Sequence, residues 1–228
     1  MDLKGFGASP KPADGAYSVH DQAGLLGELI LTRSLTNLTL VGHSLGGGVA
    51  LATTLALAAV APERIRRLVL IDSISYDQTL PWFIRVLRTP GLGELTVALL
   101  PPAVQVRMVL RYAFHDPRLI TDDVVAAYAA PIHDSAARGA LVATARQLIL
   151  PDMAAFTDRY REIDLPVLLL WGRQDRVVPV SLGQRLQRAL PRAELHVVDP
   201  CGHVPHEERP DTALEVIERF LALHAGPH

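Results

Sequence analysis

The sequence has a single cysteine, Cys201, so the chain cannot form an internal disulfide. It also has no excess of charge of either sign. Its 22 Lys and Arg residues stand against 24 Asp and Glu residues, a formal net charge of −2. This balance gives no electrostatic case for binding nucleic acid or an anionic membrane, and we expect neither as a partner. One thiol is compatible with a reducing compartment, and a cytoplasmic location is the expectation.

The sequence also lacks an apolar run that reads convincingly as a membrane span. The longest run, residues 45–61, contains three glycines and two threonines, and arginines follow it at positions 64, 66 and 67. A helix buried against a sheet accounts for such a run better than a bilayer-spanning helix does. The first residues, Met1–Gly5, contain no apolar segment of a signal peptide.

The most informative motif is the pentapeptide Gly42-His43-Ser44-Leu45-Gly46, which follows an apolar run at 38–41 and precedes an Ala- and Leu-rich segment. Gly-x-Ser-x-Gly between a strand and a helix is the pattern of a nucleophile elbow. The turn is so tight that the serine backbone is strained, and we expect the flanking glycines to remove collisions. The pattern predicts Ser44 as a nucleophile and the Leu45 backbone N–H as a donor to an oxyanion.

A serine hydroxyl needs a base, and the base needs an acid that orients it. Residues 166–171 read as a buried strand, and the loop after it contains Asp175. Residues 194–198 read as another strand, and the loop after that contains His203. Open parallel sheets place their sites at the carboxyl ends of the strands, so we predict Asp175 as the acid and His203 as the base.

Other residues compete for these roles. Asp72 ends a further apolar strand and is the alternative acid, but Asp175 follows the strand nearest in sequence to that of the histidine. His206 lies in the same loop as His203, and we expect a structural role for it. The two histidines have no further ligands at suitable spacing, so neither a metal nor a cofactor is expected.

Taken together, these motifs resemble the α/β-hydrolase superfamily over nearly the whole chain. Residues 2–9 resemble the Asp-x-x-Gly-x-Gly-x-Ser loop of that family, and residues 171–179 and 202–205 resemble its acid and histidine loops. The resemblance implies an α/β fold, with a mostly parallel sheet, flanking helices and an inserted lid. Residues 1–72 and 164–228 would form the core. Esterases, lipases, carbon–carbon bond hydrolases, perhydrolases and aminopeptidases share these motifs.

One departure from the family pattern concerns the N-terminus. In complete members, three strands, a helix and most of a fourth strand precede the point at which the resemblance begins. That stretch carries the second oxyanion donor, and losing one such donor typically costs about 100- to 1,000-fold in turnover. The elbow strand would also be an unprotected apolar edge. We therefore expect the polypeptide to be N-terminally incomplete. The alternative is a shortened protein whose edge a partner chain covers, as in a homo-oligomer.

Residues 73–163 differ from the rest of the chain, because strand-like runs give way to helical segments separated by prolines. We predict that they form a helical lid over Ser44, which encloses substrate and excludes water. The segment contains nine arginines and nine acidic residues, which argues against a strongly charged substrate. Its larger apolar side chains are candidates for the pocket, and we expect His43 and Trp82 to contact substrate.

The predicted function is a serine hydrolase that cleaves a small to medium, mostly apolar carboxylic ester or related acyl compound through an acyl-enzyme. A carbon–carbon bond hydrolase or perhydrolase on the same fold is the alternative, because it would use the same three residues with a different pocket. A catalytically impaired fragment or a non-catalytic binding protein is a second alternative.

Overall fold

The computed structural model describes residues 1–225, which fold around a four-stranded sheet. The strands are β1 (Leu38–His43), β2 (Ile65–Ile71), β3 (Val167–Gly172) and β4 (Ala193–Val198), in the order β1-β2-β3-β4. Each neighbouring pair is parallel, so all four carboxyl ends meet at one edge of the sheet. The predicted α/β fold with a parallel sheet and flanking helices is confirmed.

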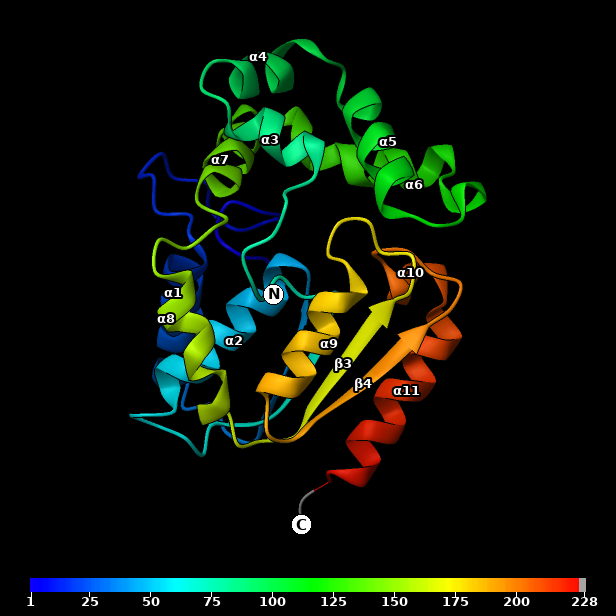
Figure 1. Ribbon diagram of the computed structural model, residues 1–228. Coiled ribbons are helices and arrows are strands. Elements are labelled where there is room, and N and C mark those ends of the chain that lie inside the picture. The colour runs from blue at the N-terminus through cyan, green and yellow to red at the C-terminus, as the bar shows by residue number, and fades with distance from the viewer. Residues whose placement is uncertain (226–228) are drawn as a thin grey trace.

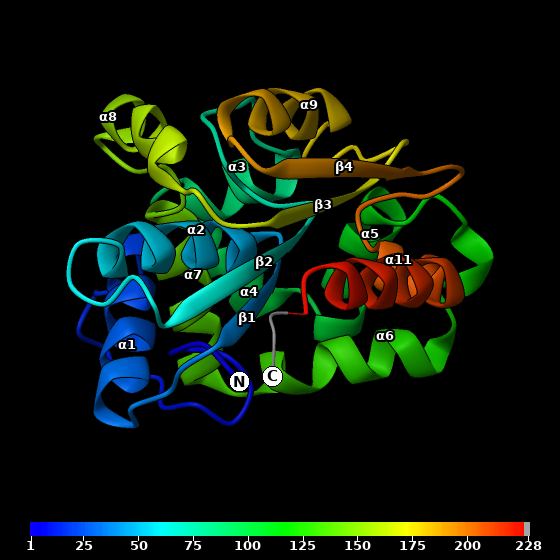
Figure 2. The ribbon, with the colours of Figure 1, turned by 90° about the horizontal axis from the view of Figure 1, so that it is seen from below.

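Helices cover both faces of the sheet, which explains the apolar composition of its inner strands. All six residues of β3 are buried, because side chains on both of its faces pack against helices. One face packs on α1 (Val19–Thr32), α2 (Leu45–Leu57) and α9 (Val180–Ala189), and the other packs on α11 (Pro210–Leu223). Figure 2 shows α11 on the opposite side of the strands from α1, α2 and α9.

The elbow strand β1 lies at the edge of the sheet, as expected, and pairs only with β2. Leu38 and Leu40 are partly buried against the core on the face of α1 and α2. Val41 is 59% exposed, because among the described residues no helix covers that part of the opposite face. That the polypeptide is incomplete at its N-terminus stays a prediction.

The described residues between β2 and β3 contain helices and no strand. The α-helices are α3 (Trp82–Arg88), α4 (Leu92–Leu99), α5 (Pro102–Ala113), α6 (Asp122–Ala129), α7 (Ser135–Arg146) and α8 (Met153–Asp158). Short 3₁₀ turns η1 (Pro117–Leu119), η2 (Ala130–His133) and η3 (Arg159–Glu162) accompany them. Figure 1 shows α3–α7 grouped beyond the carboxyl ends of the strands.

The last part of this helical segment packs on the core of the sheet. Phe156, Tyr160 and Ile163 are buried in the same apolar cluster as α2, and the Tyr160 hydroxyl donates to the carbonyl of Ser75 at 2.5 Å. Figure 1 shows α8 beside α2, away from α3–α7. The division into a core and a lid at residues 73–163 stays a prediction.

Within residues 1–225, no single helix combines the length and the apolar character needed to cross a bilayer. Helices α4 and α5 have the required length and apolar character only when they are counted as one segment, and the chain bends by 113° between them.

Candidate active site

The elbow places Ser44 in a strained backbone conformation between β1 and α2. Its φ is 51° and its ψ is −116°, in a region that non-glycine residues rarely adopt. A Cβ at Gly42 would collide with the backbone of Gly46 and Gly47, so this glycine is required by close approach. The expectation of a similar collision at Gly46 is wrong, because a Cβ there would meet no atom within 4 Å.

The three residues predicted for the site lie together in one chain of hydrogen bonds. The Ser44 hydroxyl lies 3.0 Å from His203 Nε2, and His203 Nδ1–H donates to Asp175 Oδ2 at 2.8 Å. The other carboxylate oxygen, Asp175 Oδ1, accepts the backbone N–H groups of Val177 and Val178 at 2.7 and 3.0 Å. This is the geometry in which a base can take a proton from the serine and an acid can orient the base.

The parallel sheet is what brings these distant residues together. Ser44 follows β1, Asp175 lies three residues beyond β3, and His203 lies five residues beyond β4. Leu45 opens α2 directly after Ser44, and the first backbone N–H groups of a helix have no partner within it. The Leu45 N–H is therefore placed beside the serine, as an oxyanion donor would be.

Asp72, the alternative acid, directly follows β2 and is fully buried beside the three residues. Its Oδ1 accepts the backbone N–H of Gly172 at 2.9 Å. Burial, and then the charge of Asp175, raise the pKa of Asp72 well above its usual range. The raised pKa favours the neutral form of Asp72, which supports the start of the Asp175 loop, whereas the imidazole of His203 is bonded to Asp175.

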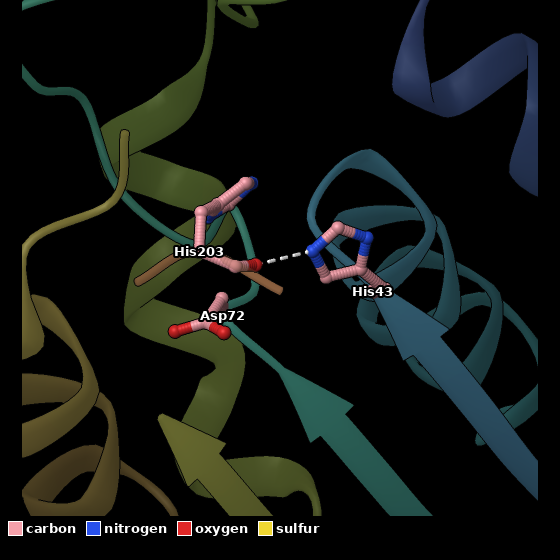
Figure 3. A group of neighbouring side chains, drawn as sticks. All are labelled: His43, Asp72 and His203. Atoms are coloured by element: carbon pink, nitrogen blue, oxygen red, sulfur yellow. Dashed lines mark hydrogen bonds between the residues drawn. The ribbon is translucent and has the colours of Figure 1, made fainter. Parts of the chain in front are cut away.

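His43 contacts the histidine loop through its own ring. Its Nε2–H donates to the main-chain carbonyl of His203 at 2.7 Å, as Figure 3 shows. The ring centroid lies 4.8 Å from that of His203 and 4.7 Å from that of His206. Burial, followed by the charges of those two histidines, lowers the pKa of His43 to about 3. His43 is therefore neutral and acts as a hydrogen-bond donor.

Figure 3 draws His43, Asp72 and His203 as one group of neighbouring side chains. Their potential ligand atoms lie within 4.8 Å of one another. Both ring nitrogens of His203 are already bonded, and His43 Nε2 is bonded to the carbonyl of His203. A metal ion here would break the hydrogen bonds of the site. The absence of a metal and of a cofactor stays a prediction.

The lowered pKa of His43 predicts a loss of stability in acid. The unfolded chain binds a proton on this residue below pH 6.5, and the folded protein does not until about pH 3. The contribution of His43 to the free energy of unfolding is therefore complete above pH 6.5. It decreases as the pH is lowered, by at most about 1.4 kcal/mol per pH unit. Urea denaturation at several pH values measures it. Between pH 6 and pH 4, the free energy of unfolding of the variant His43→Gln should decrease less steeply than that of the wild type. An equal slope in the two proteins would contradict the lowered pKa of His43.

A cavity of about 370 Å³ opens beside the site, between the helices beyond the sheet and the histidine loop. Both predicted contact residues, His43 and Trp82, line it, together with His203. The other lining residues are Phe83, Ile84, Val86, Leu87, Thr96, Leu100, Gln105, Val106, Met108, Val109, Leu110, Ala113, Tyr128, Ile132, Leu141 and Val204. None of these described residues is Lys, Arg, Asp or Glu, so the cavity offers a substrate no charged partner.

A larger hollow of about 930 Å³ lies away from Ser44, at the amino ends of the strands. It is lined by residues such as Asn37, Ile65, Arg66 and Arg192. None of its described lining residues belongs to the hydrogen-bonded chain at Ser44, so the smaller cavity is the candidate substrate pocket.

Comparison with known proteins agrees with this architecture. A family model described as the alpha/beta hydrolase fold matches residues 1–210. The 2-hydroxymuconate semialdehyde hydrolase of Pseudomonas putida is 33% identical over 228 residues, which is 97% of this chain and 75% of that protein. An uncharacterized hydrolase of Bacillus subtilis is 29% identical, over 97% of this chain and 78% of its own length.

Solved structures give the same fold. The 2-hydroxy-6-oxo-6-phenylhexa-2,4-dienoate hydrolase of Rhodococcus matches with a TM-score of 0.78 at 23% identity, covering 97% of this chain and 78% of that one. A thermophilic esterase of Thermogutta terrifontis matches with a TM-score of 0.75 at 23% identity, covering 98% of this chain and 78% of that one. The chain belongs to the α/β-hydrolase fold family. Its relatives include a 2-hydroxymuconate semialdehyde hydrolase, and the solved structures that share its fold include an esterase.

Proposed function

We propose that the protein is a serine hydrolase that cleaves uncharged, mostly apolar carboxylic esters. The observation that carries this proposal is the hydrogen-bonded chain from the Ser44 hydroxyl through His203 to Asp175. A nucleophile, a base and an orienting acid in this order are the parts that acyl transfer needs.

The reaction would proceed in two halves. His203 Nε2 takes the Ser44 proton while Oγ attacks the ester carbonyl carbon, and the Leu45 N–H donates to the oxyanion. His203 then gives the proton to the departing alcohol, which leaves an acyl-serine. Water attacks the acyl carbonyl carbon as His203 takes a proton from the water. His203 then gives that proton to Ser44 Oγ as the bond to the acyl group breaks, and the carboxylic acid departs. Asp175 holds the imidazole and stabilises its charged form throughout.

The pocket supports an uncharged substrate. A carboxylate moved from water into an apolar cavity without a cation to pair with it is strongly disfavoured. The described lining residues contain no such cation, and most of them are aliphatic or aromatic. An acyl chain held among Phe83, Met108 and Leu110 would gain from apolar burial instead.

Carbon–carbon bond hydrolysis is the second candidate, because the 33%-identical relative is named a 2-hydroxymuconate semialdehyde hydrolase. A muconate semialdehyde carries a carboxylate, which would need a cationic or strongly donating partner in the pocket. The lining residues of this chain that could donate to it are few and neutral, such as Gln105 and Thr96. The pocket therefore favours the ester over the dienoate.

A substrate comparison tests the proposal. We expect p-nitrophenyl butyrate or hexanoate to be cleaved with a kcat/KM at least about 100-fold above that for 2-hydroxymuconate semialdehyde, the scale of an unpaired buried charge. Spectrophotometric assays of both substrates measure the ratio. The reverse preference would assign carbon–carbon bond hydrolysis. No cleavage of either, with no labelling by a fluorophosphonate, would leave a non-catalytic protein.

The balanced charge of the chain supports a small-molecule substrate as its main partner. A cytoplasmic location, the absence of nucleic acid, membrane and cofactor, and association into a homo-oligomer belong to the same proposal.

A further inference from the structure

A buried carboxylate outside the three-residue chain joins the histidine loop to the helices above it. Glu208 ends the short helix α10 (Pro205–Glu208) and is 4% exposed. Its Oε1 accepts the backbone N–H of Gly202 at 2.7 Å. Its Oε2 accepts the backbone N–H groups of His115 and Asp116 at 2.8 and 3.0 Å. Three backbone N–H groups thus satisfy the Glu208 carboxylate, and none of these contacts is with a cation.

The two sets of donors come from two segments that border the site. Gly202 immediately precedes His203, and His115 and Asp116 follow α5, which lines the substrate pocket. The same two segments meet directly where the His203 backbone N–H donates to the carbonyl of Ala113 at 2.8 Å. The approach is close, because a Cβ at Gly202 would lie 2.6 Å from the His115 nitrogen.

Independent contacts hold the same junction. Val204, one residue beyond the predicted base, is buried in an apolar cluster with Leu110 and Phe114. On the acid side, the Arg176 guanidinium donates to the Phe114 carbonyl at 3.0 Å. The end of α5 is therefore fixed to both loops that carry the acid and the base.

The Cys201 thiol belongs to this junction as well. It is fully buried and lies 3.8 Å from Glu208 Oε1. Burial, and then the charge of Glu208, raise the pKa of the Cys201 thiol above its usual range. The thiol stays protonated and is a fourth, weak donor to the carboxylate.

We propose that Glu208 is a positioning residue that holds His203 within reach of Ser44 by joining the histidine loop to the end of α5. The inference rests on the proposed function, since it assigns His203 the role of base. Only a carboxylate offers an acceptor oxygen to each set of donors. A glutamine would point its NH₂ group at one of them, so one side of the junction would open.

Glu208→Gln tests the proposal, with Glu215→Gln on the exposed face of α11 as a control that removes the same charge. For p-nitrophenyl butyrate we expect Glu208→Gln to lower kcat by about 10- to 100-fold, the effect of displacing a catalytic group by up to an ångström. KM should stay within about threefold, because the pocket is intact. The rate of fluorophosphonate labelling should fall with kcat, and Glu215→Gln should match the wild type.

A merely structural role would give a different result. Active-site titration with the fluorophosphonate counts the folded, reactive molecules. A lower count of sites with an unchanged rate per site would overturn the proposal. If the wild type itself is not labelled, the proposed function fails. If the wild type is labelled and Glu208→Gln reacts as fast per site, only the positioning role fails.

Hydrogen exchange on the wild-type protein decides the matter if Glu208→Gln does not fold. The amides of His115, Asp116 and Gly202 should exchange slowly and at similar rates, because one carboxylate binds all three. Exchange of His115 and Asp116 as fast as the exposed loop at 13–15 would show that the junction does not hold, and would overturn the proposal.

Discussion

Ser44→Ala is expected to lower kcat/KM for p-nitrophenyl butyrate by about 10⁴- to 10⁶-fold relative to the same chain with serine, the range for removing an activated nucleophile. The hydroxyl is the only group at the elbow placed 3.0 Å from His203 Nε2 among the described hydrogen bonds. Alanine removes the attacking oxygen and leaves the strained turn with the same backbone, so the loss should be of reaction rather than of fold.

Labelling with a fluorophosphonate, followed by intact-protein mass spectrometry, checks this expectation without a choice of substrate. The wild type should gain one adduct and Ser44→Ala none. Ser181→Ala, on the exposed start of α9, is the control and should label as the wild type does. Adduct formation on Ser44→Ala at the wild-type rate would show that another residue is the nucleophile.

The two buried aspartates should respond very differently to replacement by asparagine. Asp175→Asn should lower kcat/KM by about 10⁴-fold, because the amide favours the wrong tautomer of His203 and cannot stabilise its charged form. Asp72→Asn should stay within about tenfold of the wild type. The raised pKa of Asp72 favours its neutral form in the folded protein, and an amide oxygen can still accept the Gly172 N–H.

The stability of Asp72→Asn provides a second measurement. Because the folded-state pKa of Asp72 lies above the unfolded value of 3.8, wild-type stability is complete below that pH and falls as pH rises toward the folded-state pKa. Asparagine removes this loss, so the variant should gain stability relative to the wild type between pH 4 and pH 7. A large loss of activity in Asp72→Asn with little in Asp175→Asn would instead make Asp72 the acid.

Several features of the site could be read from short stretches of sequence. The strained turn at Ser44 depends only on contacts between neighbouring residues. It could therefore be predicted from Gly42 and Ser44 placed between a strand pattern and a helix pattern. The position of the acid and base loops follows from parallel strands, whose carboxyl ends must share an edge. The family match over residues 1–210 agrees with that interpretation.

Other features depended on distances that no local pattern contains. Asp72 and Asp175 both follow apolar strands, and only the folded loops show which carboxylate meets the imidazole. Glu208 gave no signal, since its donors lie six residues before it and more than ninety residues away. Residues 150–163 fall within the predicted lid, and only the folded chain shows that Tyr160 packs on α2 rather than over the pocket.

The sequence by itself determined the parallel α/β sheet, the strained serine turn and the placement of Ser44, Asp175 and His203 at one edge of the sheet, because each follows from steric rules or from strand direction. The tertiary structure alone decided the partner of His203, the raised pKa of Asp72, the lowered pKa of His43, and the carboxylate that joins two distant loops. These depend on burial and on contacts between remote segments, and both are set only when the chain packs into three dimensions.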